Sequence, residues 1–212
     1  MNDVIKYLKN NVDSLYTTYL KDYDKLDTKI SLFTAGPSGA GKTEFAISLL
    51  DEEPNLIHLD IDNVRNFFKP LGYTGNNSDL FQKPSSWAVQ YLFDEIVKNR
   101  GLSFILDSNL THFQTAKENI HKLLKSKYRI EIFYIYNAPE TCFLYTQLRE
   151  NITHRVVPED VFFKSIIQSR ITTYEIKKLF NYKIILNVVD KRDNQYYKDV
   201  SADDFYNIIP EG

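Results

Sequence analysis

The segment Gly36-Pro37-Ser38-Gly39-Ala40-Gly41-Lys42-Thr43 constrains the fold more than any other part of the chain. It matches the pattern G-x-x-x-x-G-K-[ST], in which a glycine-rich loop joins a strand to a helix. The segment before it, 30–35, is short, apolar and partly β-branched, as a buried strand would be. The apolar residues after it, 43–50, recur at helical spacing. Because both flanks fit, an accidental glycine-rich turn is a poor alternative, and the segment predicts a site for nucleotide phosphates.

The residue types in this loop suit a polyphosphate. Glycine has no Cβ, so Gly36, Gly39 and Gly41 can adopt positive φ and bring backbone amides close to phosphate oxygens. The helix that follows adds free N–H groups and a partial positive charge at its first turn. Lys42 supplies a full charge near the β- and γ-phosphates, and the Thr43 hydroxyl can ligate Mg²⁺. A nucleoside triphosphate with Mg²⁺ is therefore the expected ligand.

Composition limits the class of protein. Of the 212 residues, 43% are hydrophobic and 25% are charged, which suits one α/β domain of ordinary core size. The net charge of −2 gives no bulk attraction to nucleic acid or to a membrane surface. No apolar run could cross a bilayer, the first residues do not resemble a signal peptide, and Cys142 is the only cysteine. These features predict a cytoplasmic protein without disulfides, membrane contact or stable nucleic-acid binding.

Periodicity divides the chain into an N-terminal helical segment, 1–28, and an α/β domain, 29–212. In the first segment, apolar residues recur every three or four positions from Val4 to Leu20, which predicts one or two amphipathic helices. Packing against the outside of the domain is their favoured role, and a surface for a partner protein is the alternative.

The domain alternates strands with helices. Further strands are expected at 56–59, 102–107, 130–136 and 182–188, and helices at 84–99, 113–126, 139–150, 159–180 and 202–209. The segment 69–82, rich in glycine and asparagine, is expected to be a loop that binds the acceptor or merely connects. This order predicts a three-layer α/β fold of the P-loop NTPase type, with about five mostly parallel strands flanked by helices.

Carboxylates follow two of the predicted strands. Asp60 and Asp62 come directly after the strand 56–59, and Asp107 ends the strand 102–107. Ligands of open parallel sheets bind beyond the carboxyl ends of the strands, so these groups should lie on the edge that carries the phosphate loop. We expect one of the first pair to cap a helix and the other, preferably Asp62, to accept the proton of an attacking hydroxyl. Asp107 is expected to orient Mg²⁺ or substrate, with a helix cap as its alternative.

The segment 149–158 has the composition of a lid. Arg149 and Arg155 are separated by a short polar stretch, and Pro158 opens the next helix. A planar guanidinium can stabilise the charge on a transferring phosphoryl group. We expect this role for Arg155 more than for Arg149, and the alternative is a solvated basic helix end. Arg170 is a weaker candidate, with a salt bridge on a solvated face as its alternative.

Taken in chain order, four features resemble the zeta toxin family of bacterial toxin–antitoxin systems, whose members are ATP-dependent kinases of UDP-N-acetylglucosamine. They are the phosphate loop, Asp60-x-Asp62-x-x-Arg65, the strand ending in Asp107-Ser108-Asn109, and Arg155-Val156-Val157-Pro158. The likeness runs from about Ile30 to Asn194. It includes the loop Tyr73-Thr74-Gly75-Asn76-Asn77.

The resemblance implies phosphorylation of a sugar hydroxyl of UDP-N-acetylglucosamine or a related nucleotide sugar, with ATP and Mg²⁺ as cofactors and an antitoxin as protein partner. It implies that Lys42 and Thr43 contact the phosphates and Mg²⁺. It also implies that Asp62 is the base and that Arg155, and less strongly Arg149, contacts the transferring phosphate.

The same resemblance places Asp107 at the substrate and the metal, and it adds Arg65, Asn109 and Tyr73 to the expected substrate site. The turn Asp107-Ser108-Asn109-Leu110 departs from the Gly/Thr-rich turn of many zeta toxins. It is similar to an Asp-x-Asn-Leu segment of polynucleotide 5′-kinases. No acidic sugar-binding residue can be placed around Gln90.

Three alternatives remain open from the sequence. The first is a polynucleotide or nucleoside kinase, which the acidic net charge disfavours for long nucleic acid. The second is a nucleotide-dependent switch, but the chain lacks the guanine-reading Asn-Lys-x-Asp, which favours ATP. The third is an inactive interaction module, which the presence of Lys42, Asp62 and Arg155 disfavours.

Overall fold

A six-stranded sheet forms the centre of the protein in the computed structural model, which describes residues 2–153 and 156–209. The strands are β1 (Ile30–Ala35), β2 (Ile57–Asp60), β3 (Phe104–Asp107), β4 (Arg129–Tyr136), β5 (Ile185–Asp190) and β6 (Gln195–Tyr197). Their order in the sheet is β2-β3-β1-β4-β5-β6. The first five are parallel, and β6 pairs with β5 in the antiparallel sense. The predicted α/β fold with mostly parallel strands is confirmed, with one short edge strand more than expected.

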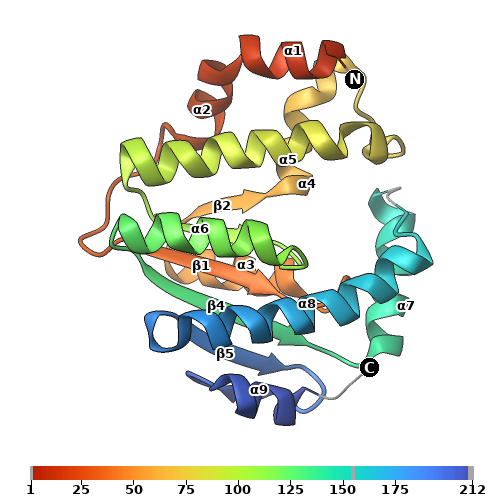
Figure 1. Cartoon of the computed structure of the whole chain (residues 1–212). Coiled ribbons are helices and arrows are strands. Elements are labelled where there is room, and N and C mark those ends of the chain that lie inside the picture. The colour runs from red at the N-terminus through yellow and green to blue at the C-terminus, as the bar shows by residue number, and fades with distance from the viewer. Residues whose placement is uncertain (1, 154–155, 210–212) are drawn as a thin grey trace.

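Helices cover both faces of the sheet (Figure 1). They are α1 (Asn2–Asn10), α2 (Val12–Leu20), α3 (Lys42–Glu52), α4 (Ile61–Val64), α5 (Ser78–Glu95), α6 (Phe113–Lys125), α7 (Pro139–Thr153), α8 (Glu159–Phe180) and α9 (Ala202–Ile208). In Figure 1, α5, α6 and α8 lie in front of the sheet and α3 lies behind it. Right-handed crossovers require this division, because the chain moves one way along the sheet through α3 and the other way through the front helices.

Three short segments were not expected from the sequence. A 3₁₀-helix at Arg65–Leu71 follows α4, a π-helical turn at Ile96–Arg100 follows α5, and a 3₁₀-turn at Asn181–Lys183 delays the start of β5. Gly101, with φ of 64°, ends the π-helical turn in the left-handed conformation that glycine adopts most readily.

The start of α5 was predicted wrongly. The helix begins at Ser78 rather than at Pro84, so Pro84 lies inside it. A proline in a helix interior removes one backbone hydrogen bond, and this is why Pro84 was taken as a boundary. Phe81 stabilises the helical turn that precedes Pro84, because its ring is buried and packs on Phe68 and Tyr73. The expected loop 69–82 is accordingly shorter, and its glycine-rich part precedes the helix.

The strand register brings the acidic residues together. Asp60 at the end of β2 lies beside Asp107 at the end of β3, and β1 pairs with β3 on the other side. The phosphate loop leaves β1 at this same edge of the sheet. The edge predicted from the sequence therefore carries both the loop and the carboxylates.

Arg170 joins two helices. Its guanidinium lies 3.9 Å from the centroid of the Tyr206 ring, and its Nε donates a hydrogen bond to the carbonyl of Ile209 at 3.0 Å. The residue is buried. The alternative of a solvated face is therefore wrong, because Arg170 is buried and attaches α8 to α9.

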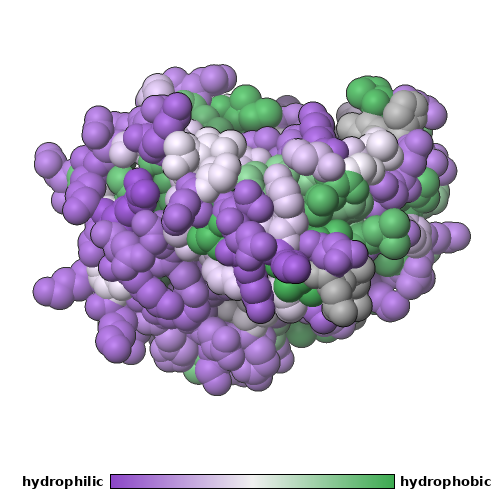
Figure 2. All heavy atoms as spheres, turned by 90° about the horizontal axis from the view of Figure 1, so that it is seen from above, coloured by the Kyte–Doolittle hydropathy of each residue, from purple (hydrophilic) through white to green (hydrophobic). Residues whose placement is uncertain are grey.

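The surface seen from above is mostly hydrophilic, interrupted by separate hydrophobic patches (Figure 2). Among the helices of residues 2–153 and 156–209, none combines the length and apolar character that crossing a bilayer requires.

The N-terminal helices belong to the main hydrophobic core. Leu8, Leu15 and Leu20 are completely buried and share one core cluster with Leu92 and Phe93 of α5. The helices α1 and α2 thus pack on the outside of α5, which was the favoured role of this segment.

Leu15→Ala is expected to lower the free energy of unfolding by about 2–5 kcal/mol, because it removes a buried side chain and leaves a cavity. Leu80→Ala is the matched control: Leu80 is 71% exposed, so the same change should stay within about 0.5 kcal/mol. Urea denaturation of both variants measures the difference. Equal effects would show that the N-terminal helices contribute nothing to the core.

Candidate active site

The phosphate loop is shaped by its glycines. Gly36, Gly39 and Gly41 have φ of 129°, 78° and 90°. A Cβ at Gly36 would collide with the carbonyl oxygen of Ile135, and one at Gly39 with the carbonyl oxygen of Cys142. Both the backbone angles and the close neighbours therefore require glycine at these positions.

Lys42 is the first residue of α3 and curls back over the loop. Its Nζ donates a hydrogen bond to the carbonyl of Pro37 at 2.6 Å. Burial lowers the pKa of Lys42 to about 8, against an ordinary value of 10.5, although the carboxylate of Asp107 opposes this shift. The carboxylate of Asp107 offsets the effect of burial only in part. An anion bound in the loop would therefore stabilise the charged form of Lys42 further.

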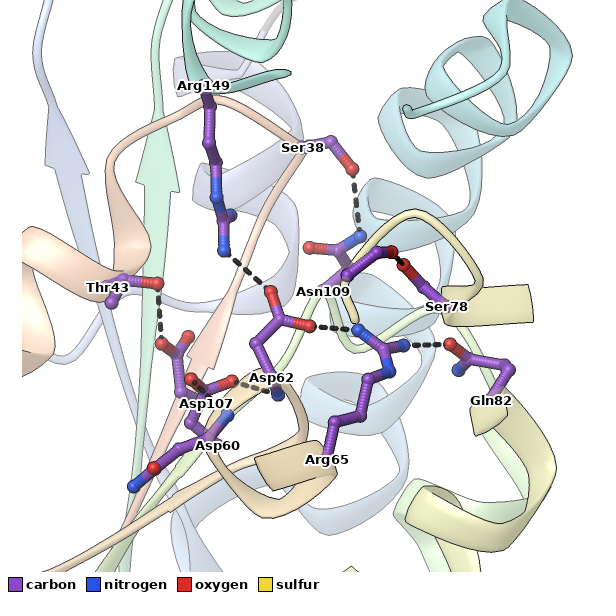
Figure 3. A network of polar contacts seen from close by, with 12 residues as sticks. Ser38, Thr43, Asp60, Asp62, Arg65, Ser78, Gln82, Asp107, Asn109 and Arg149 are labelled. Carbon is purple, nitrogen blue, oxygen red and sulfur yellow. Dashed lines mark hydrogen bonds and ion pairs between the residues drawn. The ribbon is translucent and has the colours of Figure 1, made fainter. Parts of the chain in front are cut away.

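Asp107 is the best-anchored carboxylate of the site (Figure 3). Its Oδ1 accepts a hydrogen bond from Thr34 at 2.7 Å, and its Oδ2 accepts one from the Thr43 hydroxyl at 2.8 Å. Nε2 of His58 lies 3.5 Å from Oδ2, a distance at which it attracts the carboxylate without an aligned hydrogen bond. Burial alone would raise the pKa of Asp107, but these neighbours and Lys42 together lower it. The carboxylate is therefore ionised at neutral pH.

The alternative role of Asp107 as a helix cap is excluded. The residue before α6 is His112, whose side chain makes no capping hydrogen bond, and Asp107 lies five residues earlier. Its partner Thr43 instead presents a hydroxyl beside the carboxylate, and this pair of oxygen ligands is of the type that Mg²⁺ prefers.

Asp60 has one of the two roles expected for the pair Asp60 and Asp62, that of a helix cap. The Asp60 side chain caps α4 by accepting hydrogen bonds from the backbone N–H groups of Asp62 at 3.0 Å and Asn63 at 3.2 Å. Burial and the neighbouring charge of Asp62 raise the pKa of Asp60. Asp62 makes no cap and directs its carboxylate away from the helix end, so its role as a base stays a prediction.

Two arginines hold Asp62 from opposite sides (Figure 3). Arg65 donates to Oδ1 of Asp62 and, through its other terminal nitrogen, to Oε1 of Gln82. Arg149 reaches down from α7 and donates to Oδ2 at 2.6 Å. Arg65 is completely buried, whereas the Arg149 side chain is 49% exposed. The inner arginine therefore positions the carboxylate, and the outer one pairs with it at the surface of the cleft.

The other predicted site residues do not all lie at the surface of the cleft. Arg65, predicted to bind substrate, lies behind Asp62 instead of at the cleft surface. Asn109 holds the phosphate loop, since its Nδ2 donates to the Ser38 hydroxyl at 3.1 Å. Tyr73 packs its ring against Phe81 and is not among the residues that line the cleft in the described part of the chain. Arg155 lies outside the described residues, so its predicted contact with the transferring phosphate stays a prediction.

One cleft of about 1100 Å³ unites these groups. It is lined by the phosphate loop, by Asp60, Asp62 and Asp107, and by Arg149. The sequence reasoning missed Lys191, which follows β5, lines the same cleft and donates from Nζ to the carbonyl of Gly41 at 3.3 Å. The rule that revealed Asp107, a polar residue at the carboxyl end of a parallel strand, would have found it.

A parallel sheet with a glycine-rich loop between β1 and α3, a hydroxyl–carboxylate pair beside it and a carboxylate across the cleft define the class of P-loop kinases. The family model of the zeta toxin matches residues 14–201. The chain therefore belongs to the zeta toxin family and is a P-loop kinase of that type, as its sequence motifs predicted.

Solved structures resemble the protein over nearly its whole length. A chain of the PezAT chromosomal toxin–antitoxin system of Streptococcus pneumoniae has a TM-score of 0.74 at 18% identity, covering 99% of this chain and 88% of that one. A chain of the AvrRxo1-ORF1:-ORF2 complex with ATP has a TM-score of 0.71 at 13% identity, covering 98% of this chain and 71% of that one. At these identities the likeness shows a common fold. A comparison with curated protein sequences finds no match.

The depressed pKa of Lys42 predicts a protonation change on nucleotide binding. Because its pKa is about 8 in the nucleotide-free protein, most of Lys42 is neutral at about pH 9, and the triphosphate would raise the pKa again. Binding of AMP-PNP with Mg²⁺ should then take up about one proton at that pH and less at pH 6.5. Calorimetry in two buffers of different ionisation enthalpy measures this uptake.

Lys42→Arg is the control, because a guanidinium remains charged over the whole range. The variant should bind nucleotide without the additional proton. The same uptake in both proteins would assign the proton to another group.

Proposed function

We propose that the protein transfers the γ-phosphate of ATP to a hydroxyl group of UDP-N-acetylglucosamine or a closely related nucleotide sugar. The observation that carries the proposal is the convergence of Lys42, the Thr43–Asp107 pair and Asp62 on one cleft. Membership of the zeta toxin family supports the choice of acceptor class. A structural relative that was studied with ATP supports the choice of donor.

The residues present fit Mg²⁺. The Thr43 hydroxyl and the Asp107 carboxylate are adjacent hard oxygen ligands, and the lowered pKa of Asp107 keeps it ionised. Within residues 2–153 and 156–209, no cluster of three or more His, Cys, Asp or Glu suits a metal ion. Mg²⁺ is commonly bound by one or two protein groups, and the nucleotide phosphates and water would supply its other ligands. When bound, Mg²⁺ neutralises charge on the phosphate oxygens.

The chain supplies the remaining chemistry with its own groups. Lys42 exchanges the carbonyl of Pro37 for a phosphate oxygen and brings a full charge to it. Asp62, fixed from behind by Arg65, accepts the proton of the attacking hydroxyl and keeps that hydroxyl in line with the γ-phosphate. Arg149 stabilises the charge on the transferring phosphoryl group, and we propose the same role for Arg155, which lies outside the described residues.

The ion pair between Arg149 and Asp62 determines the order in which the proposed donor and acceptor bind. The two groups face one another at 2.6 Å in the nucleotide-free protein. A triphosphate in the loop offers Arg149 a second and more highly charged partner. When Arg149 turns to it, its hydrogen bond to Oδ2 of Asp62 is broken, and the acceptor hydroxyl can take its place. Donor binding should therefore precede productive acceptor binding.

An antitoxin-type protein partner belongs to the proposal, because the structural relatives come from a toxin–antitoxin system and from a two-protein complex. The described side of α7 next to the cleft also carries exposed apolar side chains, Leu144, Leu148 and Ile152.

The decisive experiment incubates the protein with γ-labelled ATP, Mg²⁺ and a panel of nucleotide sugars, nucleosides and 5′-hydroxyl oligonucleotides. Label is expected in UDP-N-acetylglucosamine or a related nucleotide sugar, and Lys42→Ala should abolish it. Label confined to nucleosides or to oligonucleotides would replace the proposed acceptor with a nucleoside or polynucleotide kinase activity. Transfer at wild-type rates in the Lys42 variant would contradict the role of the phosphate loop.

The exchange of partners by Arg149 can be tested without any acceptor. Asp62→Asn should tighten AMP-PNP binding severalfold when Arg149 is present, because the variant removes the negative charge with which Arg149 forms its ion pair across the cleft. The same change should have no such effect in an Arg149→Gln background. Calorimetry on the four proteins measures this coupling.

Glu44→Gln is the matched control, since Glu44 is an exposed carboxylate at the first turn of α3 that lines the same cleft. Its effect on AMP-PNP binding should be equal in both Arg149 backgrounds. If Asp62→Asn behaved like this control, the effect would be general electrostatics, and the proposed exchange would be wrong.

A further inference from the structure

Lys191 connects the carboxyl ends of β4 and β5 to the phosphate loop. It follows β5 directly, and its backbone N–H donates a hydrogen bond to the carbonyl of Tyr136, the last residue of β4, at 2.9 Å. Its side chain extends along the cleft, where Nζ donates to the carbonyl of Gly41 at 3.3 Å. The ammonium lies so close to the α-carbon of Gly41 that a Cβ at this position would collide with it. Lys191 thus brings a second cation to the loop that already carries Lys42.

The turn that carries Lys191 is held by neighbouring side chains. The carboxylate of Asp190 is 2% exposed and accepts hydrogen bonds from the backbone N–H of Arg192 at 3.0 Å and from its Nη2 at 2.6 Å. The same guanidinium lies 4.6 Å from the centroid of the Tyr136 ring. The backbone of Lys191 is therefore fixed, and its ammonium reaches the loop without any rearrangement of the turn.

The surroundings of this ammonium are positive. Gly41 is the N-cap of α3, and the N-terminus of a helix carries a partial positive charge, to which the ammonium of Lys42 adds a full one. Within the part of the chain that the structure describes, no carboxylate forms an ion pair with Lys191, and the Gly41 carbonyl is its one hydrogen-bond partner. That carbonyl also accepts the helical hydrogen bond of Phe45 at 3.2 Å, so it keeps a partner when Lys191 turns away. A bound anion would give Lys191 a stronger partner than this carbonyl.

The order of the strands indicates which part of a bound nucleotide would lie next to Lys191. In the sheet, β2 and β3 lie on one side of β1, and β4 and β5 lie on the other (Figure 1). Asp62, the candidate base, belongs to the β2 side, so the γ-phosphate of a donor would face that side. The nucleoside would then extend toward the ends of β4 and β5, where Asn137, Lys191 and Asn194 line the cleft. Lys191 therefore lies on the nucleoside side of the phosphate loop.

We propose that Lys191 binds the α-phosphate of the donor nucleotide, an inference that rests on the proposed function for the identity of the donor. The lysine of a phosphate loop reaches the β- and γ-phosphates, so Lys42 leaves the α-phosphate without a full positive charge beside it. Lys191 supplies that charge when it exchanges the Gly41 carbonyl for an α-phosphate oxygen. Because the α-phosphate is present before and after transfer, Lys191 is a donor-binding residue that holds ATP and ADP alike.

Calorimetry with Mg²⁺ and either AMP-PNP or ADP tests the assignment. Lys191→Met removes the charge and keeps an unbranched side chain. It should weaken both nucleotides by the same factor, about tenfold, because both carry an α-phosphate. Lys42→Ala should instead weaken AMP-PNP more than ADP, because only AMP-PNP has a γ-phosphate. Losses in Lys191→Met that differ between the two nucleotides, or no loss with either, would overturn the proposal.

Sulfur substitution distinguishes the α-phosphate from the β-phosphate. At least one diastereomer of adenosine 5′-(1-thiodiphosphate) should bind more weakly than ADP to the wild-type protein, because sulfur replaces the oxygen that Lys191 contacts. The difference should disappear in Lys191→Met, as expected for two changes that remove the same contact. A difference that persists in the variant, or is absent from the wild type, would overturn the assignment to the α-phosphate.

Lys183→Met is the matched control. Lys183 is an exposed lysine at the opposite end of β5, and its replacement changes the net charge equally. It should leave both affinities unchanged, whereas Lys191→Arg should retain most of the affinity because the guanidinium keeps the charge. Equal weakening by the Lys183 variant would make the effect general electrostatics and overturn the proposal.

The Tm of the protein without nucleotide separates recognition from structure. Lys191→Met should leave this Tm unchanged or raise it, because the variant removes a cation beside the N-terminus of α3. The rise in Tm on addition of AMP-PNP should be smaller than in the wild type. A lowered Tm with unchanged nucleotide affinity would make Lys191 a structural residue and overturn the proposal.

The transfer assay distinguishes this proposal from the proposed function. Lys191→Met should raise the KM for ATP more than it lowers kcat, since it removes a contact present in both ground state and transition state. Nucleotide binding through Lys191 without transfer to any acceptor would contradict the proposed function and leave the assignment of Lys191 in place. Transfer by Lys191→Met with the wild-type KM for ATP would overturn the assignment and leave the proposed function in place.

Discussion

The hydrogen bond between Thr43 and Asp107 is the contact on which the geometry of the site depends. It joins the first turn of α3 to the end of β3, two elements that are 64 residues apart in the chain. The β2–β3 register then places Asp60 beside Asp107, and Asp60 in turn caps the short helix that carries Asp62. Asp107 and Asp60 thus connect the phosphate loop to Asp62 and fix the position of the candidate base. Threonine hydroxyls donate hydrogen bonds to the carboxylate of Asp107, and backbone N–H groups donate hydrogen bonds to that of Asp60.

The same chain of contacts explains why the charged groups can be so close. Burial favours the neutral forms of Lys42 and Asp60, whereas the hydrogen bonds around Asp107 favour its ionised form. The site therefore combines a carboxylate, Asp107, whose pKa is lowered with an ammonium group, Lys42, whose pKa is also lowered, to about 8. Such a combination is suited to a ligand that brings several negative charges of its own.

Much of this arrangement could be predicted from the sequence because it follows from two strong rules. A glycine-rich loop before a helix binds phosphate, and polar residues at the carboxyl ends of parallel strands meet at one edge. These rules predicted the phosphate loop and the position of Asp60 and Asp107 on one edge of the sheet, and the capping preference of aspartate predicted that one of Asp60 and Asp62 caps a helix. The role of Asp62 as the base stays a prediction. The rules could not tell that Arg65 lies behind Asp62, because a spacing of three residues shows that two side chains are neighbours but not which one faces the cleft. Pro84 misled the prediction of α5 for a similar reason, since tertiary packing of Phe81 outweighs a local rule.

The packing of the first two helices has a consequence for the far side of α5. One side of α5 lies against α1 and α2 through Leu8, Leu15 and Leu20, and another side lines the cleft with Gln82, Ser86 and Gln90. Tyr19 of α2 also donates a hydrogen bond to the carbonyl of Asn63, the residue that follows Asp62. A chain shortened to begin at residue 29 would keep the phosphate loop but would expose the apolar side of α5, and both the wall of the cleft and the helix that carries Asp62 would lose their support.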